Sequence, residues 1–218
     1  MGALCEPVRP VLRVHRIPFS TNVERVALAA AYKDVEVAWV DHDAANRSAI
    51  RELSGQDLVP VAEFAGEVVV DSMAIVERLE QLVPEPSLYP ADPAARAAAE
   101  AFVTWFNVVW KGPPNELADE LDSGAPDGEK VAELAGLLQT RLGVFEHRLA
   151  DGDYLFGDML TVADVCAFPF RSTRSGRIPT TPRRSTGSSW SIRCWATTTR
   201  ACARGSSGWT HCRARKGS

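Results

Sequence analysis

The sequence predicts an α/β domain of about 80 residues followed by an all-helical domain. Three observations lead to this prediction. Strand-like and helix-like hydrophobic patterns alternate along the first 83 residues. Four prolines then fall within residues 84–93, where they prevent a continuous helix or sheet ladder. Beyond the prolines, the apolar residues recur at helical spacing alone.

The elements of the first domain follow from the period of the apolar residues. Val23, Val26, Ala27 and Ala30 recur at helical spacing, whereas Val35, Val37 and Trp39 alternate with other residues as in a strand. In chain order we expect a strand over 11–15, a helix over 22–32, a strand over 35–39, a partly helical stretch over 44–54, strands over 61–65 and 67–71 around Gly66, and a helix that opens at Ser72. The order is β-α-β-α-β-β-α. The first two strands are expected to pair in parallel through a right-handed crossover.

The second domain is expected to contain three amphipathic helices. The first carries an apolar stripe and stops at Gly112-Pro113-Pro114, the second spans about Gly128 to Ala150, and the third is capped by Thr161 and Asp164. The expected stripes are, in order, Ala98, Ala101, Phe102, Trp105 and Val109; Leu134, Leu138, Leu142, Phe145 and Leu149; and Val165, Cys166, Ala167 and Phe168. The predicted division is therefore 8–83 for the α/β domain, 84–93 for the linker and 94–170 for an incomplete helical domain.

Composition narrows the class of protein. Of 218 residues 45% are hydrophobic, enough for a sizeable core, yet no apolar run approaches the roughly 18 residues of a membrane helix. The first ten residues lack the pattern of a signal peptide. The five cysteines show no disulfide or metal-ligand spacing, so no metal is expected. These features indicate a soluble protein in a reducing, cytoplasmic setting, with no membrane partner. No nucleic-acid partner is expected either.

The junction between the first strand and the first helix is the strongest candidate for chemistry. Thr21 and Glu24 have the spacing of a capping box, which predicts that the helix begins there. A helix N-terminus offers unpaired N–H groups and a positive dipole end, which suit an anion. Ser20 could donate its hydroxyl to that anion, or Ser20 and Thr21 could simply cap the helix.

Four motifs in register resemble the glutathione transferase family. They are Ser20-Thr21-Asn22-Val23-Glu24-Arg25-Val26, Leu58-Val59-Pro60-Val61, Asp71-Ser72 at a helix start, and Tyr154-Leu155-Phe156-Gly157-Asp158 before Thr161-x-x-Asp164. The first motif is most similar to the serine-type phi class and its bacterial relatives. The resemblance covers residues 11–170 and implies a thioredoxin-like first domain that binds glutathione, a helical second domain, and a homodimer.

The resemblance also gives roles to particular residues. It implies a cis bond before Pro60, with the main chain of Val59 pairing with the glutathione backbone as an added strand. Asp71 is expected to hold the ammonium of the γ-glutamyl end, and Ser72 with the helix N-terminus its carboxylate. The co-substrate is expected to be a small hydrophobic electrophile. Ordinary turn and capping roles are the alternatives for these residues.

Within this resemblance, Ser20 is expected to donate a hydrogen bond to the glutathione sulfur and so stabilise the thiolate. A free thiol has a pKa near 8.5, and lowering it by about two units takes roughly 2.7 kcal/mol. One charge-assisted hydrogen bond of roughly 1.5–3 kcal/mol plus a helix N-terminus of roughly 0.3–1 kcal/mol suffices. The alternative function is a non-catalytic glutathione-binding or protein-interaction member of the same fold.

The sequence departs from the family at some positions and leaves others open. Leu58 stands where the family often has Gln, and Gln56 lies two residues earlier. His42, Arg47 and Arg51 are candidates for binding the glycyl carboxylate, with solvated surface charge as the alternative. Four apolar residues of the second domain could line the co-substrate pocket or belong to the core: Trp105, Phe106, Val109 and Trp110.

Residues 171–218 differ from the rest of the chain in amino-acid composition. They hold 11 of the 24 Lys and Arg residues and no Asp or Glu, so the other 170 residues hold 13 basic and all 28 acidic residues. The segment also has 17 Ser and Thr and no hydrophobic period. Read in another frame, Ile192 to Ala214 can encode a string containing LRAWIERV, which resembles a terminal helix of the family. We therefore expect a frameshift near 170–171, with an irregular tail after it, in preference to a basic nucleic-acid-binding extension or a linker.

Overall fold

The computed structural model describes residues 12–150 and 152–172 of the chain. The α/β domain contains four strands, β1 (Leu12–Arg16), β2 (Val37–Asp41), β3 (Val61–Phe64) and β4 (Glu67–Val70), and three helices, α1 (Thr21–Tyr32), α2 (Ser48–Ser54) and α3 (Ser72–Leu82). The predicted order β-α-β-α-β-β-α is confirmed. Element ends differ from the prediction by at most four residues, and the largest difference is at the start of α2.

The sheet has the order β2-β1-β3-β4. β1 and β2 are parallel as predicted, while β3 is antiparallel to both β1 and β4. The β3–β4 hairpin turns through Ala65 and Gly66, which have φ of 50° and 93°. Two consecutive positive φ values match the type I′ turn that suits the twist of a two-residue hairpin.

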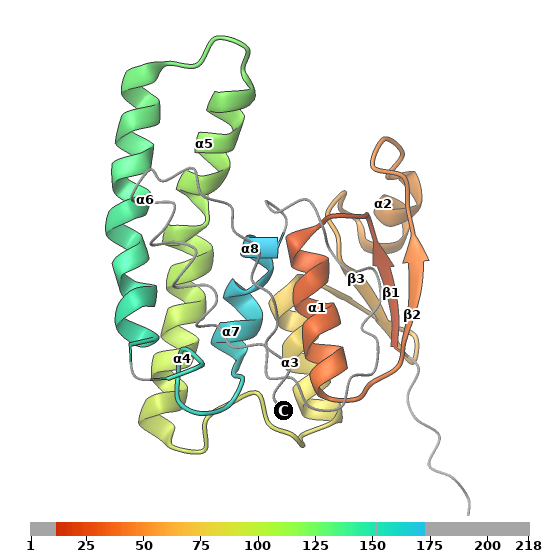
Figure 1. The fold of residues 1–218 in the computed structure, drawn as a ribbon. Coiled ribbons are helices and arrows are strands. Elements are labelled where there is room, and N and C mark those ends of the chain that lie inside the picture. Colours follow the sequence, from red (N-terminus) through yellow and green to blue (C-terminus); the bar gives the residue numbers. More distant parts are fainter. Residues whose placement is uncertain (1–11, 151, 173–218) are drawn as a thin grey trace, which may run out of the picture.

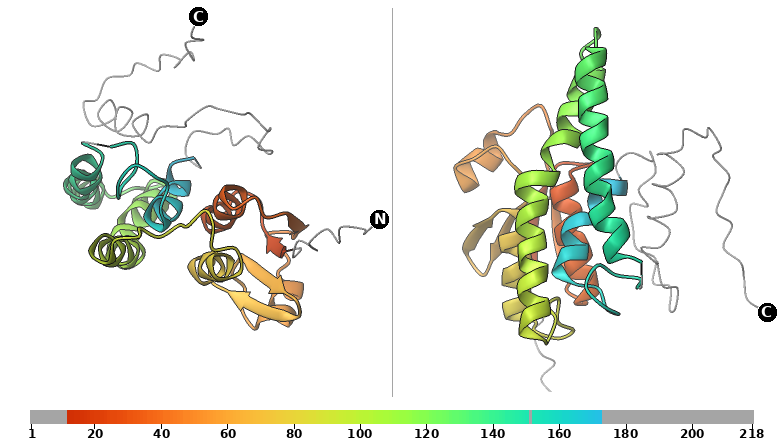
Figure 2. Two further views of the ribbon diagram at one scale, coloured as in Figure 1. Left: turned by 90° about the horizontal axis from the view of Figure 1, so that it is seen from below. Right: turned by 90° about the vertical axis from the view of Figure 1, so that its left-hand side faces the viewer.

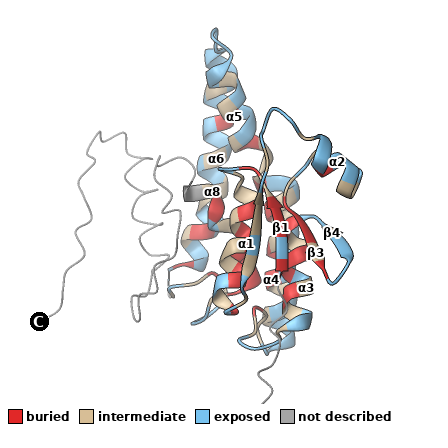
Figure 3. Ribbon diagram, turned by 90° about the vertical axis from the view of Figure 1, so that its right-hand side faces the viewer, coloured by how far each residue is buried: buried red, intermediate tan, exposed pale blue. Residues whose placement is uncertain are grey.

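The two faces of the sheet are covered differently. Leu12 and Val14 of β1 pack in the main core beneath α1 and α3, which lie between the sheet and the second domain in Figure 1. Because side chains alternate along a strand, Ile17 points to the opposite face, where it packs with Ile50 of α2 and Val61 of β3. Figure 3 shows the burial of β1 and β3 and the exposure of the outer surface of β4.

The helical domain begins where the proline-rich stretch ends. Its elements are α4 (Pro93–Trp105), a π-helical turn η1 (Phe106–Trp110), α5 (Gly112–Asp122), α6 (Gly128–Arg148), α7 (Val162–Ala167) and α8 (Pro169–Ser172). In Figure 1, α5 and α6 extend as a long pair beyond the rest of the domain. Gly112-Pro113-Pro114 was expected to end a helix, and it does so, but it also begins α5. Proline is accepted in the first helical turn, where its missing N–H has no partner to lose.

The two domains share one core. Buried residues of α1 and α3 form a single cluster with those of α4, η1, α6 and α7, including Val26, Ile75, Phe106 and Phe145. The views in Figure 2 show α7 lying against α1 on the side away from the sheet. The Nε of Arg25 in α1 donates to the carbonyl of Cys166 in α7, at 2.8 Å. The α/β domain therefore rests on the helical domain through packed side chains and hydrogen bonds.

Some expected core positions are displaced by one residue. The predicted stripe of α4 included Ala101 and Val109, but Ala101 is exposed and Val109 is 38% exposed, while Ala99, Phe102 and Phe106 are buried. The π turn adds a residue per turn and carries Trp110 inward instead. Phe168 was expected to be buried but is 37% exposed; it lies between the end of α7 and the start of α8.

The predicted start of α7 is confirmed in detail. Thr161 is its N-cap, and a capping box joins Thr161 and Asp164. Asp164 also accepts from the main-chain N–H of Leu155 at 2.9 Å, which ties the preceding loop to the helix. The expectations for the tail, including the frameshift, concern residues outside those that the structure describes.

Candidate active site

Three of the motifs singled out in the sequence meet at one end of the sheet. His15 of β1 lies opposite Val61 of β3, and Val61 lies opposite Val70 of β4. The residues just before Val61 and just after Val70 therefore lie beside the loop that leaves the carboxyl end of β1. Those residues are Val59 and Pro60, Asp71 and Ser72, and the loop leads to Ser20.

Ser20 is the N-cap of α1, but its side chain makes no capping hydrogen bond. The expected capping box of Thr21 and Glu24 is wrong, because Thr21 already has helical geometry and Ser20 occupies the cap position. Phe19, immediately before Ser20, has φ of 66° and is 79% exposed. A bulky residue at positive φ is strained, and such strain concentrates at functional sites. The hydroxyl of Ser20 stays available at a helix N-terminus.

The peptide bond between Val59 and Pro60 is cis, as expected. Pro60 is buried and directly precedes β3, while Val59 is partly buried against the cluster of Ile17, Ile50 and Val61. The ladder between β1 and β3 begins at Val61, so the main chain of Val59 is not part of it. Leu58, at the position where Gln is frequent in the family, is 64% exposed.

Asp71 and Ser72 start α3, and Asp71 is the residue that caps it. Its Oδ1 accepts from the main-chain N–H groups of Met73 and Ala74, at 2.8 and 3.1 Å. Asp71 has φ of 73°, so a second strained residue lies at this end of the sheet. Ser72 is 2% exposed, and its Oγ accepts from Nη1 of Arg25 at 3.3 Å. This contact joins the N-terminal turns of α1 and α3.

Arg25 and Lys111 are site residues to which the sequence reasoning gave no role. Nη1 of Arg25 also lies 3.2 Å from Oδ1 of Asn22, and Nζ of Lys111 donates to the same oxygen at 3.1 Å. The apolar period gave no signal for Arg25, which lies on the face of α1 opposite the predicted stripe of Val23, Val26, Ala27 and Ala30 and is nonetheless buried. A charged residue at a buried helical position usually has partners that justify it. Lys111, 89 residues from Asn22, had no signal either.

The candidates for the glycyl carboxylate each have a partner within the chain. Nε2 of His42 lies 2.8 Å from Nδ1 of His15, whose Nε2 lies 2.8 Å from Glu63. Burial, and next the neighbouring His15, lower the pKa of His42. Arg47 donates to the carbonyls of Ala44 and Asp57, and Arg51 pairs with the Asp57 carboxylate at 2.6 Å. None of the three is singled out by this geometry.

The aromatic residues of the second domain are mostly core. Phe106 is fully buried and Trp110 is 9% exposed; their rings stack at 4.7 Å and both meet Phe145 edge-on. Trp105 is partly buried against the same core. Val109 is more exposed and remains available to a ligand.

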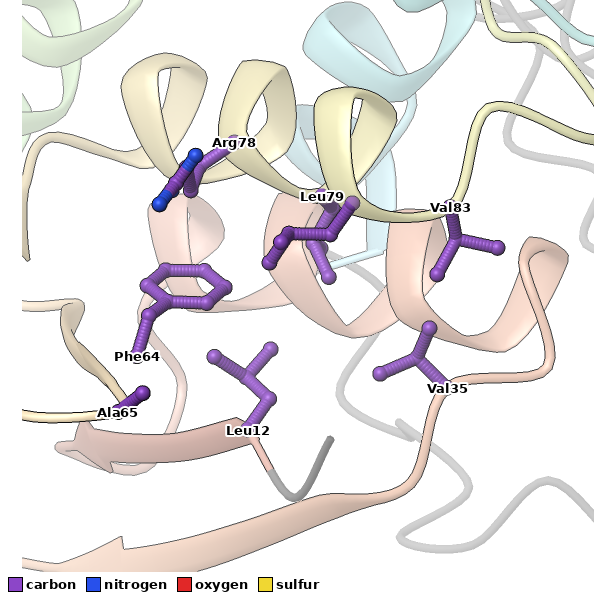
Figure 4. Close-up of a pocket in the computed structure, with 8 residues that line it drawn as sticks. Leu12, Val35, Phe64, Ala65, Arg78, Leu79 and Val83 are labelled. Carbon is purple, nitrogen blue, oxygen red and sulfur yellow. The ribbon is translucent and has the colours of Figure 1, made fainter. Parts of the chain in front are cut away.

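A cavity of about 270 Å³ lies at the other end of the α/β domain (Figure 4). It is lined by the start of β1, the end of β3 and the C-terminal turns of α3, with Leu12, Phe64 and Leu79 facing it. Its cation, Arg78, pairs with Glu67 at 3.1 Å. Leu12 begins β1, whereas Ser20 lies beyond the other end of this strand, so the cavity is separate from the candidate site.

In the described residues, no cluster of His, Cys, Asp or Glu could hold a metal ion. The helices of the same part of the chain include none with the length and hydropathy to cross a membrane. Cys166 is buried beside Arg25, and burial raises the pKa of its thiol to about 11. A thiol with that pKa is neutral near pH 7 and is no candidate nucleophile.

The fold and the clustered motifs define a two-domain protein of the glutathione-transferase type. Residues 14–87 match the glutathione S-transferase N-terminal domain, and residues 97–173 match the glutathione S-transferase C-terminal domain. Together the two matches show that the chain belongs to the glutathione S-transferase family. The thioredoxin-like first domain and the helical second domain are those expected from the sequence.

Individual relatives cover the chain unevenly. A probable glutathione S-transferase of Nicotiana tabacum is 26% identical over 151 residues, 68% of this chain and 65% of the relative. The maleylpyruvate isomerase of a Ralstonia species is 28% identical over 77% of this chain and 81% of its own. FtsZ-localized protein A of Caulobacter vibrioides is 31% identical over 46% of this chain and 47% of its own. The chain thus spans less than two thirds of the tobacco relative.

A solved structure agrees with the fold. The crystal structure of a glutathione S-transferase from Rhodospirillum rubrum F11 is 28% identical, with a TM-score of 0.65. The similarity covers 77% of this chain and 81% of that one.

Proposed function

We propose that this protein is a glutathione transferase in which Ser20 stabilises the thiolate of glutathione during its reaction with a small electrophile. The observation that carries the proposal is the hydroxyl of Ser20, which makes no capping hydrogen bond at the N-terminus of α1 and lies at the same end of the sheet as Val59-Pro60 and Asp71-Ser72. Membership of the family supports glutathione as the co-substrate. The proposal includes the homodimer and the cytoplasmic setting expected from the sequence.

Each part of glutathione has a proposed partner in this geometry. The main chain of Val59, at the open start of β3, pairs with the peptide backbone of glutathione. The N-terminal turn of α3, with the hydroxyl of Ser72, receives the γ-glutamyl carboxylate, since the positive end of the helix dipole favours an anion there. Asp71 is exposed, so its carboxylate can also meet the γ-glutamyl ammonium.

Ser20 acts as a hydrogen-bond donor to the sulfur and not as a nucleophile or base. Ionised glutathione is the reacting species, because the thiolate is the nucleophilic form of a thiol. A charge-assisted hydrogen bond of roughly 1.5–3 kcal/mol corresponds to a fall of about one to two pKa units. The helix N-terminus adds a smaller contribution of the same sign.

Steady-state kinetics of the full-length protein test this role. With glutathione and the neutral electrophile 1-chloro-2,4-dinitrobenzene, Ser20→Ala is expected to lower kcat on the order of 10- to 100-fold at pH 6.5 and to leave the KM for glutathione nearly unchanged. Ser54→Ala is a matched control on α2, where the hydroxyl donates only to the carbonyls of Ile50 and Gln56. Equal kcat in both variants would assign thiolate stabilisation to another group.

The alternative is a non-catalytic glutathione-binding or protein-interaction member of the fold. The observation that supports this alternative is the similarity to FtsZ-localized protein A, whose name describes a localisation and not a reaction. Glutathione binding without any lowering of the thiol pKa would support this alternative over the enzyme.

A further inference from the structure

Two cations from different domains converge on one neutral oxygen. Asn22 is in the first turn of α1, two residues beyond Ser20, and its Oδ1 accepts from Nη1 of Arg25 and from Nζ of Lys111. Lys111 belongs to the second domain, between the π turn η1 and α5. Its side chain therefore crosses the domain junction to reach the helix that begins at Ser20.

Within the described residues, neither member of the cation pair, Arg25 and Lys111, forms an ion pair. Asp71 attracts both at longer range, but its Oδ1 is already engaged by the main chain of α3. The thiol of Cys166 stays protonated, with its pKa raised to about 11. The pair therefore carries more positive charge than the one carboxylate of Asp71 compensates from a distance.

Burial makes this charge costly and therefore receptive to an anion. Arg25 is 2% exposed, and its Nη2 has no hydrogen-bond partner in the part of the chain that the structure describes. Burial, and next the charge of Arg25, lower the pKa of Lys111, which is half-buried and thus still accessible to a ligand. An anion beside the ammonium restores the lost solvation and offsets the repulsion between the two cations.

The surroundings of the pair are aromatic as well as cationic. The Arg25 guanidinium lies 5.6 and 5.7 Å from the ring centres of Phe106 and Phe170, and Nζ of Lys111 lies 5.2 Å from that of Phe170. Such contacts stabilise a cation without neutralising it. Phe106 is fully buried, so of the two rings it is the partly exposed Phe170 that gives a ligand an apolar surface next to the positive charge.

We propose that Lys111 is a specificity residue that binds a carboxylate of the electrophilic co-substrate. This inference rests on the proposed function, and it narrows the substrate class to small electrophiles that bear a carboxylate on an apolar body. The γ-glutamyl carboxylate of glutathione is assigned to the N-terminus of α3 in the first domain. Lys111 approaches from the second domain, so the anion that it binds belongs to the other substrate.

A pair of probes that differ only in charge tests the proposal by binding alone. The probes are 4-chloro-3-nitrobenzoate and its methyl ester, titrated into the full-length protein with S-methylglutathione present, with tryptophan fluorescence as the readout. The variants are Lys111→Met, Lys111→Arg and the matched control Lys130→Met, at an exposed lysine of α6 that pairs with Glu120. Circular dichroism checks that each variant is folded, and a parallel titration measures glutathione itself.

The protein and Lys130→Met should bind the acid at least tenfold more tightly than the ester. Lys111→Met should abolish that preference, while Lys111→Arg retains most of it. Equal binding of acid and ester, or an unchanged preference in Lys111→Met, overturns the proposal. Weaker glutathione binding in Lys111→Met with an intact preference for the acid assigns the anion to glutathione and overturns it too. These titrations measure binding alone and need no turnover. The role of Ser20 is tested separately by kcat, so a failure of one proposal can be told from a failure of the other.

Discussion

At the scale of single residues, burial sets the ionisation of several groups around the domain junction. Cys166 is fully buried in α7, where it contacts Asn107 and the cations Arg25 and Lys111 influence it. Desolvation outweighs those cations and raises the pKa of its thiol to about 11 from an ordinary 9.0. Burial likewise raises the pKa of Tyr89 to about 12. Both groups keep their protons to a higher pH in the folded protein than in the unfolded chain.

Stability is therefore expected to fall at alkaline pH. Between pH 9 and 11 the unfolded chain releases the Cys166 proton and the folded protein does not, so the contribution of this thiol lowers the free energy of unfolding across that window and has no effect below it. A shift of two units corresponds to a loss of about 2.7 kcal/mol. Urea unfolding of the protein and of Cys166→Ala at pH 8, 9, 10 and 11 measures the effect.

The variant should show a smaller decline, because it lacks the thiol but keeps Tyr89. A parallel decline in both proteins would mean that Cys166 does not hold its proton in the folded state.

At the scale of elements, Lys33, at the C-terminus of α1, connects this helix to the linker through hydrogen bonds. Its side chain is fully buried; Nζ donates to the carbonyls of Val83 and Pro86 at 2.6 and 3.0 Å and pairs with Glu80 at 2.6 Å. Glu80 in turn accepts from the main-chain N–H of Leu88 and the hydroxyl of Ser87. The ion pair of Lys33 and Glu80 thus provides hydrogen-bond partners for main-chain groups where α3 ends and the linker begins.

Lys33→Met should cost about 3–5 kcal/mol, because it leaves two buried carbonyls and a carboxylate without their donor. Urea denaturation measures the loss, with the exposed Lys130→Met as a control that should change stability little. Wild-type stability in Lys33→Met would show that water or another group replaces the ammonium.

The elements themselves were largely predictable from local pattern, whereas the contacts between them were not. Alternation over Val35, Val37 and Trp39 located β2, and the Thr161–Asp164 spacing located the start of α7, because these signals lie within a few residues of chain. The Gly112-Pro113-Pro114 stop concealed the start of α5, since proline both ends and begins helices.

In the candidate site, too, single residues could be predicted from the sequence, whereas the contacts between them could not. Ser20, Pro60 and Ser72 could be named from their motifs, but the link from Arg25 to Ser72 spans 47 residues and that from Lys111 to Asn22 spans 89. Neither follows from any local period, because both depend on how α1, α3 and the second domain pack.

At the scale of the whole molecule, the family resemblance and the composition change at the same place. The match to the C-terminal domain of the family ends at residue 173, and the acid-free, arginine-rich stretch begins at 171. We retain the proposal of a frameshift near 170–171 on these two observations.

Resequencing the DNA around codons 168–174 tests it. A missing base there, with the restored frame encoding the LRAWIERV string, is expected. An unchanged reading frame in independent clones, together with messenger RNA of the same sequence, would show that the tail is the true product.

The central claim is that Ser20 stabilises the thiolate of bound glutathione, and its most direct test is the ultraviolet absorbance of that thiolate as a function of pH. The titration uses the full-length protein saturated with glutathione, alongside Ser20→Ala and Ser54→Ala. In the protein and in Ser54→Ala, the thiol pKa should fall by about two units from its free value near 8.5. In Ser20→Ala it should return by at least one unit while glutathione still binds. A thiol pKa that is the same with and without the Ser20 hydroxyl would contradict the claim.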